Sequence, residues 1–187
     1  MWHQIGMLAT QSRLIDPYPR EHFVVLYSDD NKCDKLISKY INEGLKRKQL
    51  CVYASIRMNE RVSPKISSQI IHYEENIKNK NLLNISLKPF YSSSLNNDMK
   101  PFEDIEKELA NKVTDRKDTR IRFVCDLTGF LFNTTHFDEC INLEQWWQNK
   151  PFPGSYVCLY PNLMLSKYPF HFQKNMVFRI HDDVILC

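Results

Sequence analysis

The stretch FVVLYSDDNKCDKLISKYI, residues 23–41, contains a strand-like run, a polar turn and a helix-like segment in succession. The continuous apolar run Phe23–Tyr27 is typical of a strand buried on both faces of a sheet. Apolar residues at helical spacing between Cys33 and Ile41 predict an amphipathic helix. A second apolar run, Leu50–Ile56, follows. Together these segments predict a right-handed β-α-β unit.

The turn of this unit reads Ser28-Asp29-Asp30-Asn31-Lys32. In nucleotide-binding α/β proteins, a glycine-rich loop at this junction cradles phosphate. This turn has no glycine, and a carboxylate about 4 Å from a phosphate charge costs roughly 1–4 kcal/mol, depending on the effective dielectric. We therefore reject ordinary phosphate binding at the turn and expect any ligand there to be neutral or cationic. Asp29, Asp30 or Asn31 is predicted to cap the helix.

The same alternation of strand-like and helix-like segments continues along the chain and predicts a three-layer α/β domain, with helices flanking a mostly parallel sheet. Residues 1–20 are predicted to be an N-terminal arm and residues 21–187 a single domain. A polar run, Phe90–Lys100, is predicted to be a loop that could cover a site. Further strands are expected at 82–87, 120–126 and 155–160, and helices at 63–77, 101–113 and 135–148. Residues 162–187 are expected to form a helix interrupted at Pro169 and a short apolar end.

The composition limits the class of protein. The chain has 187 residues with 43% hydrophobic content, which indicates one folded domain. Its net charge of +3 is too balanced to suggest direct nucleic-acid binding. We find neither a run of about 18 apolar residues nor a secretory signal, so a soluble cytoplasmic protein is expected. Six cysteines without a C-x-x-C pair predict reduced structural thiols.

Polar side chains follow the strand-like runs at their carboxyl ends, where ligands bind in open parallel sheets. Asp126 after an apolar run matches the Walker B pattern, in which a carboxylate holds Mg²⁺ beside a nucleotide, but a strand-end aspartate also serves as a cap. Both interpretations stay open. No metal site is assigned, although a divalent cation on the aspartates is kept as a minor alternative. The candidate ligand-binding residues are Ser28, Asp29, Asp30, Arg57, Asp126 and Thr128.

Other chemistry-bearing residues give weaker signals. His136 and Cys140 are four apart on an expected helix and could form half of a zinc site, but no second half is found. Three isolated histidines, His22, His171 and His181, are expected to be structural. Trp146-Trp147 could line an apolar pocket or form a partner surface, because adjacent tryptophans on a helix cannot both face one core stripe. No G-x-S-x-G motif is present, and neither catalytic residues nor a cofactor are expected.

Several of these segments resemble the methanogen/methylotroph DcmR-type sensory (MEDS) domain family. This resemblance implies a relative of the RecA/KaiC ATPases that has lost the phosphate loop and has a sensory or regulatory role. KaiC-like ATPases carry two catalytic glutamates after the second strand, whereas residues 55–60 read SIRMNE here. Helix-turn-helix or kinase regions often accompany the family, and this chain is expected to carry neither. The matching segments are HFVVLY (22–27), YINEGL (40–45), LCVY (50–53), the run ending in Asp126, Tyr156–Tyr160 and His181–Leu186.

The sequence therefore predicts a non-catalytic sensory or regulatory domain that binds a small ligand or a protein partner in signal transduction or transcriptional control. One alternative is a nucleotide- or metal-binding ATPase relative that uses Asp126. A second is a structural interaction module that forms oligomers through the N-terminal arm and the region of Trp146-Trp147. No membrane association is expected.

Overall fold

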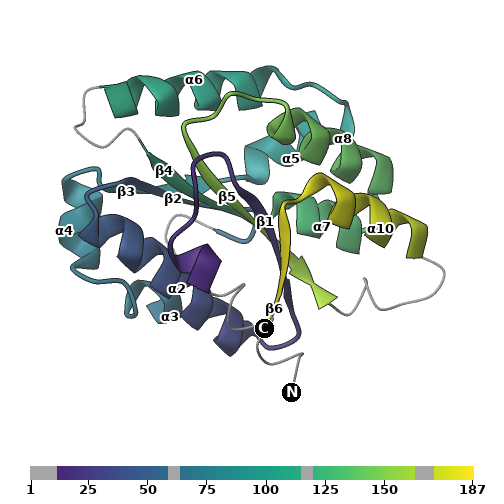
Figure 1. Cartoon of the computed structure of the whole chain (residues 1–187). Helices are drawn as coiled ribbons and strands as arrows, with labels where there is room; N and C mark the ends of the chain where they lie inside the picture. Colours follow the sequence, from purple (N-terminus) through teal and green to yellow (C-terminus); the bar gives the residue numbers. More distant parts are fainter. Residues whose placement is uncertain (1–11, 59–63, 115–119, 163–170) are drawn as a thin grey trace.

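Six parallel strands form one sheet through the centre of the molecule (Figure 1). The computed structural model describes residues 12–58, 64–114, 120–162 and 171–187. Along the sheet the strand order is β3-β2-β4-β5-β1-β6, and every described pair is parallel, so the predicted fold class is confirmed. The strands are β1 His22–Tyr27, β2 Leu50–Ser55, β3 Leu82–Ser86, β4 Ile121–Cys125, β5 Gly154–Pro161 and β6 Asp183–Leu186.

Helices cover both faces of this sheet (Figure 1). One face carries α2 (Asp30–Lys46), α3 (Pro64–Ser67) and α4 (Tyr73–Lys78). The opposite face carries α5 (Lys88–Leu95), α6 (Lys100–Thr114), α7 (Leu127–Asn133), α8 (Phe137–Gln148) and α10 (His171–Ile180).

Two hydrophobic cores result, one on each side of the sheet. Along β1, Phe23 and Val25 belong to the core under α2, whereas Val24 and Leu26 belong to the core under α7 and α8. Because successive side chains of a strand point to opposite faces, a strand covered on both sides needs apolar residues at every position. This requirement explains the continuous apolar run in the sequence.

The helix α2 begins as the sequence predicts. Asp29 has an extended backbone (φ −130°), and its Oδ1 accepts hydrogen bonds from the backbone N–H groups of Asn31 at 2.8 Å and Lys32 at 3.3 Å. Such a cap satisfies amide groups that have no partner within the helix. The predicted helix-capping role is therefore confirmed for Asp29.

The predicted loop over Phe90–Lys100 is wrong, because most of this run is helical. Helix α5 ends at Leu95, and α6 already begins at Lys100. A proline in the first turn, Pro89, presets a helical backbone angle. Ser94 is buried, and its hydroxyl donates to the carbonyl oxygens of Phe90 at 2.7 Å and Tyr91 at 3.1 Å. Ser94, one of the serines that suggested a loop, thus bonds within the helix.

The helix expected over residues 63–77 is also wrong in its continuity, since it divides into the short helices α3 and α4. Asn42 of α2 supplies the physical reason. Its side chain donates to the carbonyl oxygen of Gln69 and accepts from the backbone N–H of Ile71, both at 2.9 Å. His72 then has a left-handed backbone (φ 46°) before α4 begins. The expected N-cap, Ser63, lies outside the described residues.

Two elements are absent from the sequence-based prediction. The strand expected to reach Asp126 ends at Cys125, and α7 follows within two residues. The short apolar end of the chain is β6, which pairs in parallel with β1 from Phe23↔Asp183 to Leu26↔Leu186. A strand of four residues with no turn signal before it gives little periodicity to recognise.

The described part of the N-terminal arm packs on the domain itself. Leu14 is fully buried in the core under α2. The carbonyl oxygen of Ile15 accepts a 3.0 Å hydrogen bond from Arg122, a buried β4 side chain that also donates to Gln49 and to the Tyr40 carbonyl. Burial lowers the pKa of Arg122, while its carbonyl and amide acceptors satisfy the guanidinium.

All six cysteines are free thiols. Five are buried, and Cys187 is half-buried. Among the described residues, no helix combines the length and the apolar character needed to cross a membrane.

Gly129 of α7 provides a test of this packing. A Cβ atom at this position would lie 1.9 Å from the carbonyl oxygen of Leu159 in β5. Backbone oxygen cannot rotate away, so we expect Gly129→Ala to lower the free energy of unfolding by about 3 kcal/mol, at the upper end of overpacking effects. Urea denaturation followed by circular dichroism measures the change.

The matched control is Asn133→Ala, an exposed position at the end of the same helix. This change should stay within about 0.5 kcal/mol of the wild-type protein. Equal stability of the two variants would contradict the close approach of α7 to β5.

Candidate functional site

Asp126 joins the carboxyl ends of two neighbouring strands. It follows β4 directly, and its Oδ2 accepts a 2.6 Å hydrogen bond from the Ser55 hydroxyl at the end of β2. Its Oδ1 accepts a 2.7 Å hydrogen bond from the backbone N–H of Ile56. The Ser55 hydroxyl in turn accepts from the backbone N–H of Arg57 at 3.1 Å. Both carboxylate oxygens therefore already have protein partners.

The environment of Asp126 is that of a structural group. Burial raises its pKa, and the hydrogen bonds from Ser55 and Ile56 offset part of this effect. A carboxylate that holds Mg²⁺ needs at least one oxygen directed toward the ion. Here each oxygen is directed toward a donor at the end of β2, so a structural role accounts for both oxygens, although the Asp126 side chain makes no capping hydrogen bond to α7, the helix that follows it.

The other predicted site residues gather only in part. Arg57, Asp30 and Asp126 all act electrostatically on Tyr27, the last residue of β1, so these four residues share one end of the sheet. Burial raises the pKa of Tyr27 to about 12, although Arg57 opposes the increase. Thr128 follows the end of β4 as well, but it is fully buried in the first turn of α7 and so is not exposed at this edge.

The turn before α2 is exposed and polar. Ser28 and Asp30 are exposed, and the Ser28 backbone N–H donates to the carbonyl oxygen of Cys187 at 3.2 Å. Asp29 is committed to the helix cap. The acidic turn therefore performs two structural tasks, which are to start α2 and to hold the end of β6 beside β1.

A hollow of about 570 Å³ opens beside this turn. Its apolar wall includes Leu26 and Leu186, whereas three lysines of α2 stand on its polar side. These lysines favour an anionic group attached to an apolar body. The two aspartates alone predicted a neutral or cationic ligand, and the lysine residues argue against that expectation. The three lysines are Lys32, Lys35 and Lys39.

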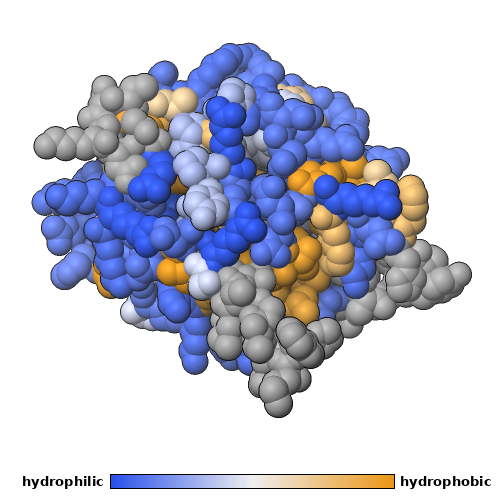
Figure 2. Space-filling view, in the orientation of Figure 1, coloured by the Kyte–Doolittle hydropathy of each residue, from blue (hydrophilic) through white to orange (hydrophobic). Residues whose placement is uncertain are grey.

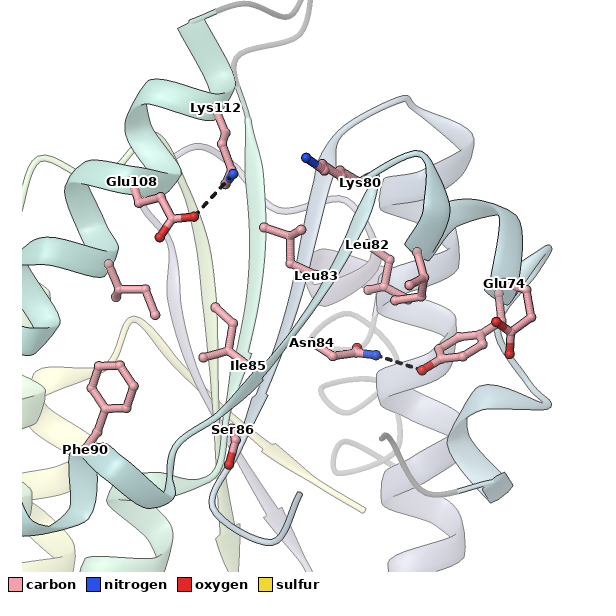
Figure 3. A pocket seen from close by; sticks show the side chains of 13 residues that line it. Glu74, Lys80, Leu82, Leu83, Asn84, Ile85, Ser86, Phe90, Glu108 and Lys112 are labelled. Atoms are coloured by element: carbon pink, nitrogen blue, oxygen red, sulfur yellow. Dashed lines mark hydrogen bonds and ion pairs between the residues drawn. The ribbon is translucent and has the colours of Figure 1, made fainter. Parts of the chain in front are cut away.

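A second hollow, of about 730 Å³, runs along β3 between α4 and α6 (Figure 3). In the described ranges β3 pairs only with β2, so its outer edge faces this groove. Glu108 and Lys112 of α6 form an ion pair at 3.2 Å, and Asn84 donates to the Tyr73 hydroxyl at 2.7 Å (Figure 3). These polar groups are paired along the groove walls and do not converge on one point.

Hydrophobic surface gathers around α10 and β6 on the face shown in Figure 2. Phe172 of α10 is 70% exposed and Leu186 of β6 is 49% exposed. The region of Trp146-Trp147 differs. Trp147 is buried in the core, and Trp146 is half-buried with the Lys150 ammonium 4.5 Å from its ring centre. Core packing thus accounts for Trp147.

A cluster of ionisable side chains lies inside the core under α8 and α10. We call it the interior cluster, and each member is buried, with an exposed fraction of 7% or less. The potential ligand atoms of the four residues all lie within 4.8 Å of one another. Among the described residues, this is the cluster of His, Cys, Asp or Glu side chains whose atoms lie close enough together to hold a metal ion. The members are His22 at the start of β1, Glu144 of α8, Cys158 of β5 and His181 before β6.

The charges of the interior cluster are set by burial and by close partners. Burial lowers the pKa of His181 to about 4, although the Glu144 carboxylate opposes this decrease. Burial also opposes ionisation of Glu144, but its interactions with His181, His22 and Tyr160 lower its pKa to about 2. The Tyr160 hydroxyl donates a 2.5 Å hydrogen bond to Glu144 Oε1. An ionised carboxylate is therefore enclosed in the core.

Sequence analysis did not predict that these four residues form a cluster. His22 and His181 were assigned structural roles because each stood alone in the chain, and neither Glu144 nor Cys158 carries a motif. Only the parallel pairing of β1 with β5 and β6 places them side by side. His136 and Cys140, the sequence-based zinc pair, do not join the cluster, and Cys140 instead lies 3.3 Å from the Tyr160 hydroxyl.

Comparisons with known proteins agree with this architecture. The crystal structure of the flagellar accessory protein FlaH from Methanocaldococcus jannaschii is similar, with a TM-score of 0.52 and 12% sequence identity. The match covers 90% of this chain and 73% of FlaH, and it shows the RecA-like fold alone. No curated protein matches the sequence. A family model described as "MEthanogen/methylotroph, DcmR Sensory domain" matches residues 21–176. Since this match spans most of the sequence, the chain belongs to the MEDS family of sensory domains.

Proposed function

We propose that this chain is a non-catalytic sensory domain that uses a RecA-like sheet as a scaffold and no longer processes nucleotide. One observation carries the proposal. The two groups that a RecA-like ATPase would direct at Mg²⁺-nucleotide, the amides before α2 and the carboxylate after β4, are both bonded within the protein.

The amides at the start of α2 lack the freedom that phosphate binding requires. A phosphate loop presents unpaired backbone N–H groups at a helix N-terminus. Here Asp29 accepts from two of these groups and adds a negative charge of its own. A bound phosphate would have to displace this carboxylate or lie against it. This arrangement supports a domain without nucleotide turnover.

The sensory role of the family supports an input ligand and an output partner. The hollow beside α2 fits a small ligand with an anionic group and an apolar body, because lysines and leucines line it together. We further propose that the output passes to a protein partner, or to a second copy of the chain, in signal transduction or transcriptional control. A change around the carboxyl ends of β1 and β6 would carry the signal, since the hollow includes residues of both strands.

Calorimetry with ATP and Mg²⁺ tests the proposal. We expect no measurable heat of binding to the wild-type protein and no ATP hydrolysis. The physical reason is that a backbone amide at the start of α2 already donates to Asp29, so it is not available to phosphate. The Asp126 carboxylate already accepts a hydrogen bond from Ile56, so it is not available to Mg²⁺. Micromolar binding that is lost in Asp126→Asn would contradict the proposal and favour an ATPase relative that uses this carboxylate.

The hydrogen bonds that Asp126 accepts from the end of β2 lead to a separate prediction about stability. Asp126→Ala removes the acceptor of Ser55 and leaves the Ile56 N–H without its partner. Hydrogen bonds to charged groups contribute about 1.5–3 kcal/mol, so we expect a loss of this size in the free energy of unfolding. Chemical denaturation of the variant measures it.

Asp30→Ala is the matched control, because Asp30 is an exposed aspartate at the same end of the sheet. Its change should lower stability by less than about 1 kcal/mol, the scale of a charge in the first turn of a helix. If Asp126→Ala were as stable as the control, Asp126 would have no structural role at the strand ends.

A further inference from the structure

From the interior cluster, we propose that His22, Glu144, Cys158 and His181 form a tetrahedral site for a divalent transition metal ion of the zinc type. The four groups come from β1, α8, β5 and the junction between α10 and β6. None of them lies at the strand ends discussed above, so this proposal stands independently of the proposed function.

Four of the six distances between ligand atoms are close to those of a coordination shell, and all six are within 4.8 Å. His22 Nε2 lies 3.2 Å from Glu144 Oε2 and 3.2 Å from Cys158 Sγ. Glu144 Oε2 lies 3.5 Å from Cys158 Sγ and 3.5 Å from His181 Nε2. Ligand atoms at zinc bond lengths of about 2.0–2.3 Å are separated by about 3.3–3.8 Å along the edges of a tetrahedron. The measured separations therefore leave the ligand atoms close to their coordinating positions.

Both imidazole rings are oriented from outside the cluster. His181 Nδ1 lies 2.7 Å from the carbonyl oxygen of Val177, and a carbonyl can only accept, so the hydrogen of the neutral ring is on Nδ1. His22 Nδ1 lies 3.0 Å from the side-chain oxygen of Gln148. A second partner that fixes the tautomer in this way is typical of metal-binding histidines. In each ring, Nε2 is then left with a lone pair that faces the cluster.

One of these lone pairs is unaccounted for. His181 Nε2 is buried without a hydrogen-bond partner, and the atom it faces, Glu144 Oε2, is itself an acceptor. Two acceptors facing each other in a core are unfavourable unless a proton or a cation lies between them. A metal ion would satisfy both atoms, together with His22 Nε2 and Cys158 Sγ. This unpartnered atom is the observation that favours a ligand over a closed hydrogen-bond network.

The donor set indicates the class of metal. Two imidazole nitrogens, one carboxylate oxygen and one thiolate sulfur suit Zn²⁺ and related first-row ions, whereas Ca²⁺ and Mg²⁺ take oxygen ligands. The charge of a dication would balance the two negative charges of the ligands, one on the Glu144 carboxylate and one on the Cys158 thiolate. Four protein ligands fill a tetrahedral shell, which is the arrangement of a structural rather than a catalytic zinc site. The ion would tie the α10–β6 segment to β1 and β5.

Metal content and thermal stability test the site directly. Untagged protein stripped with a chelator and then given Zn²⁺ should retain about one ion per chain after gel filtration. With free Zn²⁺ at a hundredfold excess over its Kd, the melting temperature should rise by roughly 5–10 °C. Protein that retains no stoichiometric ion would overturn the proposal.

Cobalt substitution identifies the ligands. Co²⁺ in the stripped protein should show the visible absorption of a tetrahedral site and a thiolate-to-metal charge-transfer band. Cys158→Ser should lose the charge-transfer band, whereas Cys125→Ser should keep it. Cys125 is the control because it is a buried cysteine paired in register with Cys158 on the next strand. A band that persists in Cys158→Ser would overturn the assignment.

Two substitutions at exposed positions of α8 test the site without altering the core. Gln148→Leu removes the acceptor of His22 Nδ1, and we expect Zn²⁺ affinity to fall by roughly 10–100-fold, as for other groups that orient metal ligands. Gln145→Leu, another exposed glutamine of α8, should leave the affinity unchanged. Equal affinities of these two variants would overturn the role of His22 as a ligand oriented by Gln148.

Discussion

A carboxylate enclosed in a protein core must be compensated, and this requirement organises the packing around Glu144. Its side chain is fully buried, and its four partners come from three different segments of the chain. The compensation holds β1, β5, α8 and the α10–β6 segment together on one face of the sheet. Removal of a charge partner from such a cluster leaves an uncompensated charge, which destabilises a core much more than the loss of an apolar contact.

The carboxyl ends of the strands show the opposite organisation. In a RecA-like fold this edge is the place for a nucleotide, and a nucleotide site needs unpaired donors and acceptors. Asp29 and Asp126 instead satisfy neighbouring backbone amides, as caps do. The polar groups at this edge are thus bonded within the protein. Chemistry that depends on unpaired groups is found at the interior cluster, where His181 Nε2 has no hydrogen-bond partner.

Much of the fold follows from local sequence. The apolar runs of β1, β2, β4 and β5 predict buried parallel strands, and Asp29 predicts the start of α2. The failures have tertiary causes. Asn42 breaks the helix before His72 by bonding the backbone of residues 69 and 71, and no local pattern contains that information. Ser94 bonds within α5, although the composition of this segment is that of a loop.

Of the candidate functional residues, only those whose place depends on position along a strand could be predicted from the sequence. Asp126 could be placed at the end of β4 from its apolar run alone, whereas the sequence left open whether its carboxylate holds Mg²⁺ or has a structural role. His22 and His181 are 159 residues apart in the sequence, and only strand pairing brings their rings to a centre-to-centre distance of 4.0 Å. Glu144 lies on a helix whose buried side could not be assigned from its adjacent tryptophans. A cluster built from four segments leaves no spacing signature for sequence analysis to recognise.

We infer that the polar chemistry of this domain lies in the interior cluster and not at the strand ends. A crystal structure with anomalous scattering at the zinc edge, from crystals grown with Zn²⁺, Mg²⁺ and a non-hydrolysable ATP analogue, tests it most directly. We predict one anomalous peak between His22, Glu144, Cys158 and His181, and no nucleotide density at the start of α2. Nucleotide bound beside Asp126 with no peak in the core would contradict the account.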